Sequence, residues 1–317
     1  MQRLMWRRCW CLPFLLLGLS CSKGKSAIDT AKQDGSVQHR IVSLAPAVTE
    51  TLSALGFESQ LVGRSRFCDY PSSITSLPAV GGFFDPNVEA ILGLRPDLLF
   101  ATKGPLERSL AGLPSSIQTR FFELESANTI AEMARAISKE LGEPERGIAF
   151  ANKLNQDLQA IAKLGPIATN VPSMNDSAAK DRPLLRVLLL VGVDPIVASG
   201  DQSFPGELLR VAGGVNAIRP TGALQVAYPV LSLETLATLD PDLLLRFSGE
   251  GSHRETEFLE RYPTSKALRV VREKRVIEVR DDRMLRPGPR MAEAAKKLRT
   301  ILENATAPAH GAQGKDP

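Results

Sequence analysis

The chain has 317 residues, of which 43% are hydrophobic and 23% are charged, values typical of a globular protein long enough for two domains. Its formal net charge is +4, but three arginines lie in the first eight positions, and from residue 21 onward 36 basic residues stand against 35 acidic ones. A chain this close to neutrality has no electrostatic basis for binding nucleic acid or an anionic surface.

Residues 1–20 have the pattern of an export signal. Three arginines form a positive start, and residues 9–19 are a mostly apolar run, which is too short to span a bilayer. Ser20-Cys21 follows, which resembles a bacterial lipoprotein signal, although Gly18 stands where such signals usually have leucine. We therefore expect a signal peptide over 1–20 and a lipid on Cys21, with secretion without a lipid as the alternative.

The cysteines and histidines of the mature chain argue against both a disulfide and a metal site. Once the signal is removed and Cys21 carries a lipid, Cys68 has no partner for a disulfide. The three histidines, His39, His253 and His310, are scattered along the chain. With one cysteine they make a poor ligand set, so we expect no metal site.

The first half of the chain alternates strand and helix patterns. After a polar, flexible tether over 21–38, apolar strands are predicted at 41–44, 61–63 and 98–100. A helix is expected to begin at Ala47 or Thr49, and another covers 127–141 with apolar residues at helical spacing. This alternation predicts a parallel α/β lobe over residues 39–142.

A long helix over 143–164 then separates two similar halves and is the natural connection between lobes. A surface loop follows at 165–183. The second lobe is expected over 184–304, with a fully buried strand at 187–191, a helix at 201–212, a strand at 275–279 and a last helix at 290–302. Residues 305–317 have the composition of a loose tail.

An internal repeat supports this two-lobe organisation. Residues 89–99 (EAILGLRPDLL) recur as residues 234–244 (ETLATLDPDLL), so that Glu89 corresponds to Glu234. Asn87 and Ser232 precede the two copies as candidate helix caps. Each copy predicts a short helix, a Pro-Asp turn and a buried strand. A duplicated lobe explains this spacing, although the LxPDLL pattern is also a common helix-to-strand transition.

Several longer motifs resemble the cobalamin-binding proteins of ABC importers, part of a wider group that binds haem and ferric siderophores. The resemblance covers about residues 40–302 and rests on RIVSLAPAVTETLSALG, CDYP, VGGFFDPNVEAILGLRPDLL, YPVLSLETLATLDPDLLL and RDDRMLRPGPR. It implies an α/β protein with two Rossmann-like lobes joined by a single long helix, and a ligand cleft between the lobes.

The resemblance also implies the contacts of the ligand. Tyr70, Phe83 and Tyr228 match aromatic residues against the corrin ring, and we add Phe84 because it adjoins Phe83 in a predicted loop. Aromatic rings suit the flat face of a macrocycle. The alternative is that these loop aromatics cover the ends of the core.

Polar contacts at the ligand's edge are implied for Asp282 and Arg286, which precede a Pro-Gly-Pro loop. A solvated surface pair is the alternative. Two positions depart from the family pattern: Thr102 and Val197 stand where some family members have bulky aromatic residues. This reduces the aromatic surface on which a ligand could stack.

Glu89 and Glu234 match the two carboxylates that dock on the permease. One related carboxylate on each lobe suits a two-fold permease dimer, although a carboxylate in the first turn of a helix also interacts favourably with the helix dipole.

The leading function is therefore a substrate-binding lipoprotein that delivers cobalamin or a related corrinoid to a permease dimer and its ATPase subunits. It would lie in the periplasm or on the extracytoplasmic membrane face, attached only through Cys21. The alternative is haem or a ferric siderophore on the same scaffold, with Tyr70 or Tyr228 as an axial ligand of haem iron. No hydrolase, nucleotide-binding or catalytic-triad motif occurs, so we expect neither an enzyme nor a cofactor beyond the transported ligand.

Overall fold

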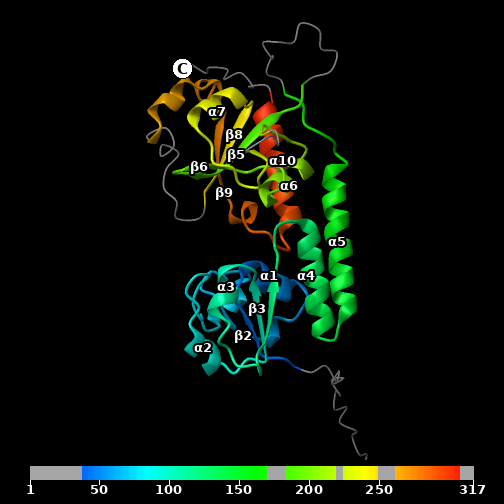
Figure 1. Cartoon of the computed structure of the whole chain (residues 1–317). Coiled ribbons are helices and arrows are strands. Elements are labelled where there is room, and N and C mark those ends of the chain that lie inside the picture. The colour runs from blue at the N-terminus through cyan, green and yellow to red at the C-terminus, as the bar shows by residue number, and fades with distance from the viewer. Residues whose placement is uncertain (1–37, 170–182, 219–223, 249–260, 308–317) are drawn as a thin grey trace, which may run out of the picture. The chain divides into compact units, whose positions relative to one another are not determined.

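The computed structural model describes residues 38–169, 183–218, 224–248 and 261–307 (Figure 1). The predicted signal peptide, Cys21 and nearly all of the tether lie outside these ranges, as does most of the 165–183 loop. Within the described ranges no helix is long and apolar enough to cross a membrane.

The N-terminal lobe is built on a parallel sheet with the strand order β2-β1-β3-β4. Its strands are β1 (Ile41–Ser43), β2 (Leu61–Arg64), β3 (Leu98–Thr102) and β4 (Gln118–Phe122). Its helices are α1 (Pro46–Ala54), α2 (Val88–Gly93), α3 (Pro105–Ser109) and α4 (Ala127–Glu140), with short 3-10 turns at Glu58–Gln60 and Ser72–Ser76.

The C-terminal lobe repeats this parallel arrangement and adds one antiparallel strand. Its strands are β5 (Arg186–Val193), β6 (Ile196–Ala198), β7 (Val215–Asn216), β8 (Leu243–Ser248) and β9 (Val276–Arg280). β5 pairs in parallel with β7 and β8, β8 pairs in parallel with β9, and β6 runs antiparallel to β5. The helices are α6 (Phe204–Val211), α7 (Leu233–Leu239), α9 (Arg269–Arg272) and α10 (Met291–Thr306), with 3-10 turns at Pro263–Ala267 and Asp282–Met284.

Helix α5 (Pro144–Ala162) joins the two lobes and packs along α4 (Figure 1). Its buried residues, which include Leu154 and Leu158, enter a large apolar cluster that also contains residues of α1, α4, α6 and α10. The expected α/β fold with two lobes and one long connecting helix is therefore confirmed.

The burial of β5 confirms a strand enclosed on both faces. Val187 and Leu189 belong to the large cluster, whereas Leu188 and Leu190 belong to a second one that Leu236 of α7 also enters. Because successive side chains of a strand point to opposite faces, an unbroken apolar run fills both clusters at once.

The repeat is also visible in matching contacts. Asp97 accepts a hydrogen bond from the backbone N–H of Arg40 at 2.8 Å, and Asp242 accepts one from that of Arg186 at 3.0 Å. The guanidinium of Arg40 donates to the carbonyl of Leu94 just after α2, and that of Arg186 donates to the carbonyl of Leu239 at the end of α7. Both distances are 2.7 Å. The Pro-Asp turn of each repeat copy thus fixes the start of the first strand of its lobe, β1 or β5, in the same way.

The predicted helix caps of the two copies are confirmed as well. The side chain of Asn87 accepts a hydrogen bond from the N–H of Ala90 at 3.0 Å, and that of Ser232 accepts one from Thr235 at 3.1 Å. Glu89 and Glu234 each lie in the first turn of the capped helix.

Some expected element boundaries were wrong. Helix α1 begins at Pro46, because proline suits the first position of a helix, where its missing N–H has no intrahelical partner to lose. Helix α6 begins at Phe204, since Ser203 caps it by accepting from Gly206 at 3.1 Å. Helix α10 continues to Thr306, so the tail starts later than residue 305.

Candidate functional site

An apolar hollow of about 240 Å³ lies at the carboxyl end of the N-terminal sheet. We call it the Phe83 hollow; its lining includes Leu44, Ser65, Phe67, Phe83, Thr102 and Arg286. Leu44 and Ser65 directly follow β1 and β2, and Thr102 is the last residue of β3. Ligands of open α/β sheets bind outside the carboxyl ends of the strands, so this is the expected place for one.

A tight loop presents the two phenylalanines. Gly81 has φ +105°, and a Cβ there would lie 2.4 Å from the carbonyl oxygen of Asp85, so only glycine fits. At the tip, the rings of Phe83 and Phe84 meet edge to face with their centroids 4.9 Å apart. Phe83 also packs against the buried cluster around Leu99, whereas Phe84 is 77% exposed. Phe83 therefore forms a fixed aromatic wall of the hollow, and the ring of Phe84 beside it is mostly exposed to solvent.

Asp282 and Arg286 do form an ion pair, at 2.9 Å. Asp282 begins a 3-10 turn rather than a plain loop, and the backbone N–H of Arg286 donates to the carbonyl of Asp282 at 2.9 Å. Arg286 also donates to Asp69 of the N-terminal lobe at 3.0 Å. Its guanidinium is therefore held by two carboxylates at the edge of the Phe83 hollow.

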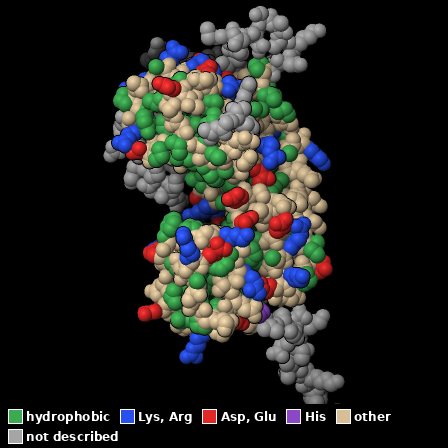
Figure 2. Space-filling view, in the orientation of Figure 1, with side chains coloured by type: hydrophobic (Ala, Val, Ile, Leu, Met, Phe, Trp, Pro, Cys, Tyr) green, Lys and Arg blue, Asp and Glu red, His purple; other side chains and the backbone are tan. Residues whose placement is uncertain are grey.

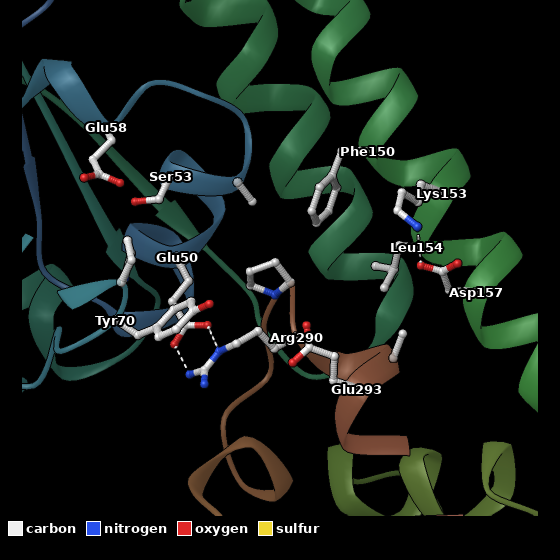
Figure 3. A pocket seen from close by; sticks show the side chains of 14 residues that line it. Glu50, Ser53, Glu58, Tyr70, Phe150, Lys153, Leu154, Asp157, Arg290 and Glu293 are labelled. Atoms are coloured by element: carbon white, nitrogen blue, oxygen red, sulfur yellow. Dashed lines mark hydrogen bonds and ion pairs between the residues drawn. The ribbon is translucent and has the colours of Figure 1, made fainter. Parts of the chain in front are cut away.

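Tyr70 is placed differently from the other aromatic residues. It lines a second hollow of about 440 Å³, which we call the Tyr70 hollow and whose walls include Ser53, Phe150, Lys153 and Arg290 (Figure 3). The guanidinium carbon of Arg290 lies 4.1 Å from the centroid of the Tyr70 ring. One face of that ring is therefore already occupied by a cation, and the structure does not bring Tyr70 to the Phe83 hollow.

Tyr228 lies in the C-terminal lobe and is about half exposed. Its partial burial raises the pKa of its hydroxyl, and the negative charge of Glu125 raises that pKa further. The backbone of Phe204 forms a hydrogen bond with Tyr228 that opposes this shift. The environment of Tyr228 therefore favours a neutral phenol over a phenolate.

Glu89 and Glu234 are both exposed. In the described ranges neither carboxylate takes part in an ion pair. On the face drawn in Figure 2 the Lys and Arg side chains are interspersed with Asp and Glu rather than gathered by sign. As far as the described residues go, the two glutamates are thus surface charges without an ion pair, on equivalent helices of the two lobes.

Three charged residues that the sequence analysis did not single out have defined partners around these hollows: Glu50, Asp69 and Arg290. Glu50 lies within the first quoted motif, and its side chain is only 4% exposed. The single charge in a helix of otherwise uncharged residues was the available signal, because buried charges need a partner. Among the described residues no cluster of three or more His, Cys, Asp or Glu could hold a metal ion.

Two α/β lobes joined by one long helix, with an apolar hollow at the strand ends, define a bilobal substrate-binding protein. The chain belongs to the periplasmic binding protein family, whose model matches residues 41–283. This is a family of binding proteins rather than enzymes.

The chain is similar to a known relative and to a solved structure, both from Vibrio cholerae. It is 28% identical over 266 residues to the vitamin B12-binding protein of Vibrio cholerae serotype O1, covering 83% of this chain and 89% of the relative. The crystal structure of the periplasmic vitamin B12 binding protein BtuF of Vibrio cholerae matches with a TM-score of 0.64 and 25% identity, covering 85% and 98% of the two chains.

The fold is shared with a heme-binding protein. The periplasmic heme-binding protein RhuT of Roseiflexus sp. RS-1, in its apo form, matches with a TM-score of 0.67 and 24% identity, covering 86% of this chain and 100% of that one. This likeness concerns the fold and leaves the ligand to be argued from the residues of the hollow.

Proposed function

We propose that this protein is the substrate-binding component of an ABC importer and captures cobalamin or a related corrinoid. The observation that carries this is the Phe83 hollow, which combines a fixed aromatic wall with the guanidinium of Arg286 at its edge. A flat amphipathic macrocycle needs this combination of an apolar face and a few polar contacts at its rim. The similarity to a vitamin B12-binding protein over most of both chains supports the same ligand class.

The Phe83 hollow is large enough for only part of a macrocycle, so the rest of the ligand would contact the C-terminal lobe. At about 240 Å³ it is smaller than the 300–1,000 Å³ typical of pockets that enclose a drug-sized molecule. It suits one face or edge of a macrocycle whose opposite face meets the C-terminal lobe. Tyr228 is the candidate contact there.

The haem alternative requires an axial ligand. Tyr70 does not line the Phe83 hollow, and one face of its ring is covered by Arg290. Tyr228 is therefore the axial candidate if the ligand is haem.

Calorimetry with residues 38–317 tests the proposal. Cyanocobalamin, cobinamide, haemin and a ferric siderophore are titrated in turn, and we expect one corrinoid per chain. A preference for haemin or the siderophore would transfer the protein to the alternative ligand class, and binding of none of the four would contradict the proposal.

Phe83→Ala should weaken corrinoid binding by about 1–3 kcal/mol, because aromatic anchors of that size carry much of the binding free energy. Tyr228→Ala should have a similar effect. Calorimetry measures both, with unfolding followed separately because Phe83 also packs on the core. Leu164→Ala is the control, since this 63% exposed side chain lies two residues beyond the end of α5. Unchanged affinity in both variants would exclude these rings as ligand contacts.

The proposal includes attachment to the membrane through a lipid on Cys21, which lies outside the described residues. Cys21→Ser should convert a detergent-partitioning protein into a soluble, released one, because no acyl chain can then be added. Phase partitioning of cell extracts measures this. Unchanged membrane association of Cys21→Ser would contradict lipidation, and Cys68→Ser is the matched control.

A further inference from the structure

The segment from Leu285 to Arg290 follows the last strand of the C-terminal lobe but lies against helix α1 of the N-terminal lobe. Leu285, Arg286 and Pro287 line the Phe83 hollow, whereas Pro289 and Arg290 line the Tyr70 hollow. The 285–290 segment thus separates the two hollows and contributes to the walls of both.

Arg290 anchors one end of this segment. Its Nε and Nη2 donate to the two carboxylate oxygens of Glu50 at 2.7 and 2.6 Å (Figure 3). The side chain of Glu50 is 4% exposed and that of Arg290 is 16% exposed, and Tyr70 covers the guanidinium on one face. A bidentate pair of this kind fixes orientation as well as distance, and the aromatic face adds a cation–π contact.

The backbone between Arg286 and Arg290 has little conformational freedom. A Cβ on Gly288 would lie 3.7 Å from both the Cα of Ala47 and Oε2 of Glu50, so the backbone lies close to α1. Pro287 and Pro289 flank this glycine, and the ring of each proline fixes φ. Asp69 and Asp282 hold the guanidinium of Arg286, and the anchor at Arg290 restrains the backbone that follows it.

We propose that Glu50, Arg290 and Tyr70 form an inter-lobe clamp whose role is to position Arg286 for the ligand. The clamp holds the 285–290 segment on α1 before a ligand arrives, so that Arg286 already faces the Phe83 hollow. Binding then needs no ordering of this segment, which is the benefit of preorganisation. This inference rests on the proposed function, and it gives Tyr70 the role of covering Arg290.

A double-mutant cycle between Arg290→Lys and Arg286→Ala tests the positioning role. Lysine keeps the charge but cannot form the bidentate fork. By calorimetry with cyanocobalamin we expect each single variant to weaken binding about tenfold, and the double variant to bind as Arg286→Ala does. Losses that multiply in the double variant would overturn the proposal, because Arg290 would then act independently of Arg286.

The matched control is Arg299→Lys, the same substitution on helix α10. Arg299 pairs with Glu303 at 2.7 Å, and its other hydrogen bonds go to Gly165, Ala212 and Leu164 rather than to α1. We expect its affinity to stay within twofold of the unchanged protein. A tenfold loss there would mean that any disturbance of α10 weakens binding, which would also overturn the positioning role.

A measurement without ligand separates failure of the clamp from failure of the proposed function. The N–H groups of Leu285 and Arg286 donate to the carbonyl of Asp282, and that of Met291 donates to Gly288. In Glu50→Gln, hydrogen exchange of these three amides should accelerate at least tenfold, while amides of β5 keep their rates. Unchanged exchange would overturn the clamp, whether or not cyanocobalamin binds.

Discussion

Replacing Glu89 and Glu234 together by alanine should leave ligand affinity unchanged and slow docking to the permease roughly tenfold or more at low salt, because complementary charge accelerates encounter. Both side chains are exposed, lie in the first turn of equivalent helices, and have no ion-pair partner in the described ranges. Neither lines the Phe83 hollow. Within the described residues each lobe thus carries one such carboxylate without an ion pair, an arrangement that suits a two-fold partner.

Docking is measured as the association rate with the cognate permease, or as stimulation of its ATP hydrolysis. The unchanged protein should dock more slowly as salt rises, and this dependence should shrink in the double variant. Glu145→Ala is the control, because Glu145 also lies exposed in the first turn of a helix, α5.

The competing explanation is that the two glutamates serve only the helix dipole. It predicts a loss of about 0.3–1 kcal/mol of stability per site with docking unaffected. Melting temperature, affinity and docking rate measured on the same double variant therefore separate the two roles.

Glu278→Ala should lower the free energy of unfolding by about 1.5–3 kcal/mol, because it removes the carboxylate that accepts a charge-assisted hydrogen bond from the buried guanidinium of Arg246. Arg246 of β8 and Glu278 of β9 are neighbours in the strand register. Their side chains form an ion pair at 2.8 Å, and each side chain is only 5% exposed. Arg280 also pairs with Glu278, at 3.0 Å, but its own side chain is 64% exposed.

The informative control removes both charges at once. In Arg246→Met/Glu278→Leu the cost of burying two ions disappears with their attraction, and apolar replacements of buried pairs are often neutral. We therefore expect the double variant to be more stable than Glu278→Ala in urea unfolding. A double variant as unstable as Glu278→Ala would mean that packing around these side chains, rather than the lost charge-assisted hydrogen bond, sets the loss.

Much of the fold was predictable because its signals are local. Asn87 and Ser232 cap their helices through bonds to residues three positions on, and the apolar runs at 98–100, 187–191 and 243–245 became central strands. Strands β4, β6 and β7 were missed. β7 is two residues long and no residue of β4 is fully buried, so neither has a strong apolar pattern.

The candidate site was less predictable. Phe83 was placed by a local feature, the glycine-dependent turn before it. Tyr70 also lies in a loop, but whether its ring meets a ligand or a guanidinium depends on Arg290, which reaches it from the far end of the chain.

The sequence by itself determined the duplicated α/β lobes, the long helix between them and the paired carboxylates Glu89 and Glu234, because short-range patterns encode each of these. Only the tertiary structure decided which charges meet. Glu50 and Arg290 are 240 positions apart and Arg286 and Asp69 are 217 apart, and no short-range pattern pairs them. Burial makes the pairing of Glu50 with Arg290 obligatory, and this burial arises only when the lobes and the 285–290 segment pack together.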